Sequence, residues 1–156
     1  MNKTEELQQL AQKSLYLGLD GDPIYAEHFS RLNKEIQILS DALYSAKGDT
    51  PEEEADICLA LLMGYSATIY SDKDKEAKKQ SILDRAWEVL EQLPPSLLKC
   101  QLLTYCYGEV FEEELAQEAH AIIDSWHGRE LTDKEQEVVE NLRNLEENQY
   151  PYCDFE

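Results

Sequence analysis

Residues 50–70 read TPEEEADICLALLMGYSATIY, and this stretch decides the fold. Its first four residues, Thr50-Pro51-Glu52-Glu53, have the pattern of a capping box with proline at the first helical position. Between Ile57 and Met63 the expected helix is apolar on every side. A helix without a polar face is buried on several sides. We therefore predict that residues 51–70 form the central helix of the fold.

The segments before and after this helix also show helical periodicity, and none alternates convincingly with a period of two. Residues 4–17 predict a short first helix, and a long second helix is expected to open at Asp22-Pro23 and to end at Gly48. After the central helix, a fourth carries an apolar stripe. Pro94-Pro95 then starts a fifth helix at about 96–107, for which Gly108 is the expected end.

Residues 105–126, YCYGEVFEEELAQEAHAIIDSW, predict a sixth helix with one apolar and one acidic face. Its apolar positions fall within an arc of about 80° at 100° per residue, and they are Phe111, Leu115, Ala119, Ile122 and Trp126. Gly128 is the expected stop. Thr132 and Glu135 then form a second capping box that opens a seventh helix.

These patterns predict an all-α protein, a single compact domain of about seven antiparallel helices around the central apolar helix at residues 51–70. Residues 1–148 are the expected helical domain, and residues 149–156 are a C-terminal tail with a proline and no helical stripe. No internal repeat and no long linker divides the chain.

The chain is strongly acidic, with 33 acidic and 14 basic residues and a formal charge of −19. Residues 101–156 alone carry 15 acidic and 3 basic residues, a net charge of −12. This composition excludes a general nucleic-acid binder, which needs a basic surface. A partner with a basic patch would be steered to this C-terminal third. The alternative is that the acidity only aids solubility.

The first residues, MNKTEELQQLAQ, lack the apolar region of a signal peptide, and the longest apolar run, ICLALLM at 57–63, is too short for a membrane span. We therefore expect a soluble, cytoplasmic protein. Its four scattered cysteines are expected to be reduced thiols.

Patterns that indicate chemistry are weak in this sequence. Neither the cysteine spacing nor the histidine spacing matches a zinc site, and the acidic turns at residues 20–22 and 72–76 fail the calcium-loop pattern. Cys106 and His120 could form a catalytic dyad only if helix packing joined them. We expect no metal, no cofactor and no enzymatic activity.

Binding to another protein explains the sixth helix better. Large aromatic residues beside an acidic face make good interface centres, although the same aromatics could instead fill the core. The predicted partner-binding residues are Glu113, Glu114, Glu118, Asp124 and Tyr107.

Four phrases carry a family resemblance: LYLGLDGDPIY at 15–25, LALLMGYSATIY at 59–70, LTYCYGEVFEEELAQEAHAIIDSW at 103–126 and GREL at 128–131. In these the chain resembles the UpxZ family of bacterial transcription antitermination antagonists.

The resemblance implies that the protein is encoded in a capsular polysaccharide operon. It also implies that it inhibits the NusG-like, UpxY-type antiterminators of other capsule loci, and we expect it to do so by direct contact. The acidic composition predicts that the protein itself does not bind nucleic acid. No family motif assigns the contact residues. The alternative from another functional class is an acidic all-helical adaptor or scaffold for an unrelated basic partner.

Overall fold

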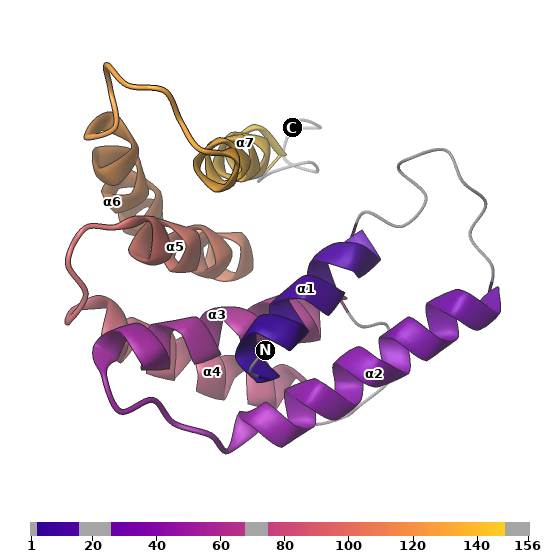
Figure 1. The fold of residues 1–156 in the computed structure, drawn as a ribbon. Helices are drawn as coiled ribbons and strands as arrows, with labels where there is room; N and C mark the ends of the chain where they lie inside the picture. The colour runs from indigo at the N-terminus through magenta and orange to yellow at the C-terminus, as the bar shows by residue number, and fades with distance from the viewer. Residues whose placement is uncertain (1–2, 16–25, 68–74, 149–156) are drawn as a thin grey trace, which may run out of the picture. The chain divides into compact units, whose positions relative to one another are not determined.

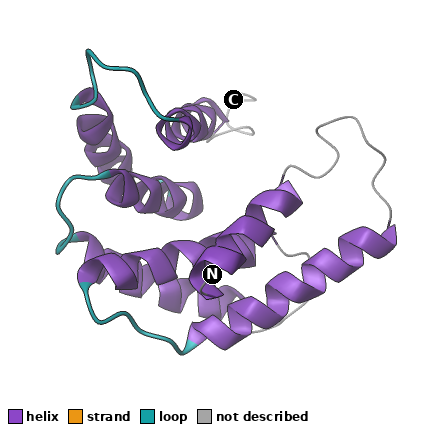
Figure 2. Ribbon diagram, viewed as in Figure 1, coloured by secondary structure: helices purple, strands orange, loops and turns teal. Residues whose placement is uncertain are grey.

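The computed structural model describes residues 3–15, 26–67 and 75–148, and every regular element in those ranges is a helix (Figure 1). Figure 2 shows only helices and loops, and no strand, in the described ranges. The helices are α1 (Lys3–Leu15), α2 (Ala26–Tyr44), α3 (Pro51–Ala67), α4 (Lys75–Leu90), α5 (Leu97–Val110), α6 (Glu113–Asp124) and α7 (Asp133–Asn148). The predicted all-α class is confirmed, with seven helices in the ranges that the structure describes. Internal contacts group the chain into two compact units, Met1–Val89 and Leu90–Glu156.

In the first unit, α3 is the buried helix that the sequence predicts. Every residue from Ile57 to Tyr65 is buried, and α3 packs against both α1 and α2. At its start the Oγ1 of Thr50 accepts a hydrogen bond of 3.1 Å from the Glu53 N–H, which is the predicted cap. Residues 68–70 of the predicted helix, like the predicted start of the second helix at Asp22-Pro23, lie outside the described residues.

Gly64 lies where α1 and α2 pack closely on α3. A Cβ atom added to Gly64 would overlap the Oγ of Ser40 on α2 and lie 3.0 Å from Cδ1 of Leu7 on α1. Ser40 and Leu7 are both fully buried. Within the described residues, the Oγ of Ser40 has no hydrogen-bond partner. The absence of a side chain at Gly64 is therefore what allows α1 and α2 to pack this closely on α3.

Arg85 of α4 fixes the connection between α2 and α3. Its guanidinium donates two hydrogen bonds of 2.9 Å to the Glu54 carboxylate. It also donates to the backbone carbonyls of Tyr44 (3.2 Å) and Ala46 (2.7 Å) at the end of α2. The hydrogen bond from Arg85 holds the pKa of Glu54 below its ordinary value, and the N–H of Gly48 adds to this effect.

In the second unit, α5 packs against α6 and α7. Its first turn is capped by Ser96, whose Oγ accepts a hydrogen bond of 3.2 Å from the Lys99 N–H. The buried side chains of this unit include Cys100, Leu102, Leu103, Cys106, Tyr107, Leu115, Ala119, Ile122, Trp126, Val138 and Leu142. Four of the five predicted stripe positions of α6 are among them.

The predicted boundary between the fifth and sixth helices is wrong. Helix α5 passes through Gly108 and ends at Val110. Phe111 is its C-cap, in the left-handed conformation with φ 51°, and the Phe111 N–H donates to the Tyr107 carbonyl at 2.8 Å. Phe111 is therefore not part of the α6 stripe. Gly108 lies where α7 approaches α5, because an added Cβ would be 3.3 Å from Cδ1 of Leu145.

Candidate functional site

The predicted partner-binding residues at the start of α6 lie at the surface. Glu113 and Glu114 are exposed in the first turn of the helix. Carboxylates at this position also stabilise the helix, because its N-terminus carries unpaired N–H groups and a positive partial charge. In the part of the chain that the structure describes, neither carboxylate forms an ion pair. Both are therefore available to a partner.

Glu118, one turn further along α6, already has an internal partner. Its carboxylate lies 2.6 Å from the Nζ of Lys99 on α5, and 47% of the Glu118 side chain is exposed. Lys99 is mostly buried and also donates to the Leu93 carbonyl at 3.2 Å. The ion pair joins α5 to α6 and neutralises part of the acidic face, so Glu118 offers less charge to a partner than the first-turn carboxylates do.

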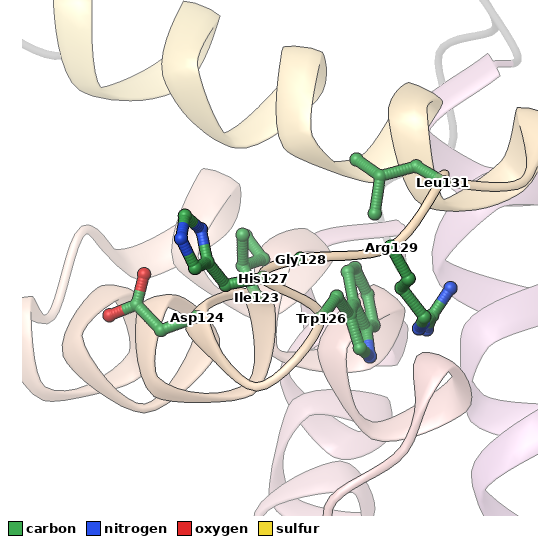
Figure 3. A pocket seen from close by; sticks show the side chains of 7 residues that line it. All are labelled: Ile123, Asp124, Trp126, His127, Gly128, Arg129 and Leu131. Atoms are coloured by element: carbon green, nitrogen blue, oxygen red, sulfur yellow. The ribbon is translucent and has the colours of Figure 1, made fainter.

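Asp124 is the last residue of α6 and is exposed. Together with six neighbours it lines an open pocket of about 470 Å³ between the end of α6 and the start of α7 (Figure 3). The lining residues are Ile123, Asp124, Trp126, His127, Gly128, Arg129 and Leu131. The sequence predicts Asp124 as a contact residue, but it gives no sign that these neighbours form a hollow.

The wall of this pocket is held by a network of charged hydrogen bonds. Arg129 donates to both carboxylate oxygens of Glu135, at 2.9 and 2.5 Å, and its guanidinium lies 5.8 Å from the centre of the Trp126 ring. Glu135 also accepts the Thr132 N–H at 2.9 Å, and Thr132 Oγ1 accepts the Glu135 N–H at 3.2 Å. The second capping box is thus confirmed, and the bonds from Arg129 and Thr132 lower the pKa of Glu135 to about 2.

Tyr107 does not share the exposure of the acidic residues. Its side chain is fully buried, and its ring packs edge-on against Phe111 with the ring centres 5.2 Å apart. A buried ring fills the core, so the structure adds no support for Tyr107 as a contact residue, and that role stays a prediction.

Two of the buried cysteines of the described residues have thiols that lose their protons only at high pH. Burial raises the pKa of Cys58 to about 12 and that of Cys100 to about 11, so both thiols are protonated at neutral pH. His120, the candidate base for Cys106, is half exposed, and its Nε2 lies 2.7 Å from the Glu146 carboxylate on α7. No group of three metal-ligating side chains occurs among the described residues.

Charge is the main chemical property of the second unit. Residues 90–148 contain 14 acidic residues and four lysines or arginines, a net charge of −10. Two of the four cations, Lys99 and Arg129, are engaged with Glu118 and Glu135. Among the helices that the structure describes, none has the length and apolar character needed to span a membrane.

Comparisons with known proteins agree on one family. Residues 4–108 match the family model of the UpxZ family of transcription anti-terminator antagonists. The fold is similar to the crystal structure of a transcription anti-terminator antagonist UpxZ from Bacteroides uniformis, with 51% sequence identity and a TM-score of 0.87. That match covers 96% of this chain and 94% of the other. No curated protein gave a significant match. This chain belongs to the UpxZ family of transcription anti-terminator antagonists.

Proposed function

We propose that this protein binds NusG-like, UpxY-type antiterminators of other capsule loci directly and blocks them, which limits the expression of capsular polysaccharide operons. Membership of the family of transcription anti-terminator antagonists is the observation that carries this proposal. A protein with this role works in the cytoplasm, where transcription takes place, and it acts by binding rather than by catalysis.

The distribution of charge supports binding through the second unit. An antiterminator of the NusG type works beside RNA polymerase and nucleic acid, and a surface that meets nucleic acid is basic. The acidic residues of α6 offer carboxylates to such a surface in place of phosphates. Long-range attraction between opposite charges speeds association and is weakened by salt. The same net negative charge disfavours contact between this protein and nucleic acid.

Glu113 and Glu114 are the first residues to test. They are exposed and free of ion pairs within the described residues, whereas Glu118 is shared with Lys99. A Glu118→Lys change would place two lysines together and disturb the packing of α5 on α6. Neutralising Glu113 and Glu114 to glutamine tests the contact without that complication.

The control variant removes the same charge from an equivalent position in the first unit. Glu5 and Glu6 are exposed in the first turn of α1, so Glu5→Gln/Glu6→Gln loses two charges and the same helix-terminal stabilisation. Binding to several purified UpxY paralogues is measured at low and high salt. We expect Glu113→Gln/Glu114→Gln to weaken binding about three- to tenfold at low salt and the control to weaken it less than twofold. Equal effects of the two variants would exclude the first turn of α6 from the contact.

The second candidate function is that of an acidic adaptor for an unrelated basic protein. The same binding assays distinguish this function from inhibition of UpxY. If the wild-type protein binds none of the UpxY paralogues but retains another basic protein at low salt, the adaptor function replaces the proposed one.

A further inference from the structure

We propose that the pocket at the end of α6 receives one lysine or arginine side chain of the antiterminator, with the aliphatic part of that side chain in the hollow and its cationic group at Asp124. This inference rests on the proposed function and names the chemistry by which the partner is held. Figure 3 shows Asp124 at one end of the lining residues and Leu131 at the other.

The inner wall of the pocket is apolar and fixed in place. Trp126 is only 8% exposed, and Ile123 and Leu131 are half-buried, so these side chains are anchored in the protein. Arg129 lies beside the Trp126 ring and is held by its two bonds to Glu135. A wall that is ordered before binding reduces the entropy lost on association. A volume of about 470 Å³ exceeds what one side chain fills, which leaves room for the adjoining backbone of the partner.

The charge in the pocket selects a cation. The positive charge of Arg129 is matched by Glu135, whereas Asp124 forms no ion pair among the described residues. The outer edge of the pocket therefore carries one negative charge, that of Asp124, which no ion pair of the described residues compensates. Long basic side chains match this combination of apolar wall and edge charge, because they bury their methylene groups while the charged end meets a carboxylate.

The negative charge of Asp124 also lies where it does not stabilise the fold. Asp124 is the last residue of α6, where the helix end carries a negative partial charge and the last turn contains no basic residue. A carboxylate there opposes helix stability by a few tenths to about 1 kcal/mol in general. The fold gives no reason for an acid at this position, and a cation from a partner supplies one.

The two tryptophans allow a direct test by NMR. The chain contains only Trp87 and Trp126, so a ¹⁵N-labelled sample gives two indole signals, and Trp87→Phe assigns them. Trp87 is on α4 in the first unit and is 40% exposed, which makes it an internal control. On addition of the UpxY paralogue that binds best, we expect the Trp126 signal to shift and the Trp87 signal to keep its position.

Substitutions then identify the chemistry of the bound side chain. We expect Asp124→Asn to weaken binding about three- to fivefold at low salt, and Glu140→Gln, which removes one exposed charge from α7 away from the pocket, to change it less than twofold. Leu131→Ala should weaken binding at high salt as well, because an apolar contact is not screened.

The outcomes test the docking pocket and the proposed function separately. If the wild type binds UpxY but the Trp126 signal does not move, the pocket is not the docking site, and the proposed function stands. If Trp126 shifts but Asp124→Asn has no more effect than Glu140→Gln, the bound side chain is not a cation and the inference is overturned. If no paralogue binds, both proposals fall together.

Discussion

Replacing Gly64 by alanine tests the packing of the first unit. Helix propensity and steric overlap predict changes of opposite sign in the free energy of unfolding. Alanine is a better helix former than glycine, and this difference alone would stabilise a helix interior by about 1 kcal/mol. The structure predicts the reverse. The added Cβ would overlap the Oγ of Ser40 and lie 3.0 Å from Cδ1 of Leu7.

The size of the effect follows from the rigidity of these neighbours. The Ser40 hydroxyl can avoid the new methyl group only by changing rotamer inside a fully buried site, so we take a steric cost of about 3 kcal/mol, the upper end for an overpacked core. After the gain in helix propensity, Gly64→Ala should reduce the free energy of unfolding by about 2 kcal/mol.

Ser40→Ala provides the second arm of a double-mutant cycle. It removes the atom that the new methyl group meets, and it also removes a buried hydroxyl without a hydrogen-bond partner in the described residues. The single variant should be stabilised by about 1 kcal/mol, since an unsatisfied buried hydroxyl is unfavourable. The coupling energy between the two substitutions should be about 1–2 kcal/mol, with Gly64→Ala less destabilising when Ser40 is alanine.

Urea unfolding followed by far-UV circular dichroism measures all four proteins. Gly108→Ala is the matched control, because Gly108 is also inside a helix and its added Cβ would meet only the flexible end of Leu145, at 3.3 Å. We expect that control to change stability by less than about 1 kcal/mol. If Gly64→Ala proves more stable than the wild type, α2 does not approach α3 as closely as described, and the reasoning fails.

Three further predictions follow from the buried and charged groups. Arg85→Met should reduce the free energy of unfolding by about 2–4 kcal/mol, because it leaves the Glu54 carboxylate, which is only 20% exposed, without its cation. A shift of the urea midpoint that corresponds to less than about 1 kcal/mol would contradict this prediction. The pKa of Glu135 is lowered to about 2, so the stabilisation from its ionised carboxylate is complete above pH 4.5 and is lost as the pH falls from 4.5 towards 2. Arg129→Met should therefore make the urea midpoint less sensitive to acid over that range. The thiols that the structure buries should resist a thiol reagent at pH 8, so that no more than one of the four cysteines reacts until urea is added.

The sequence predicted most reliably the features that depend on neighbouring residues. Both predicted caps start their helices as expected, because the hydroxyl of Thr50 or Thr132 and the N–H that it binds are three residues apart. The burial of α3 followed from its composition alone. These are local or compositional properties, and a single sequence contains them in full.

What depends on contacts between distant residues was not predictable. Gly108 resembles a helix end, but α5 continues through it, and the glycine instead accommodates the approach of Leu145 from α7. Phe111 ends the helix although aromatic residues rarely adopt the left-handed conformation. In the candidate site, Glu118 could be placed on the right face of α6, but its pairing with Lys99, 19 residues away, appears only after folding.

The Arg129, Thr132 and Glu135 network has a consequence for evolution. Its bonds require spacings of three and six residues along the chain. One residue inserted after Asp133 would rotate Glu135 by about 100° around the axis of α7 and break the bonds that its carboxylate accepts from Arg129 and Thr132. Insertions and deletions should therefore be selected against in this connection, and length differences among descendants of the gene should accumulate elsewhere.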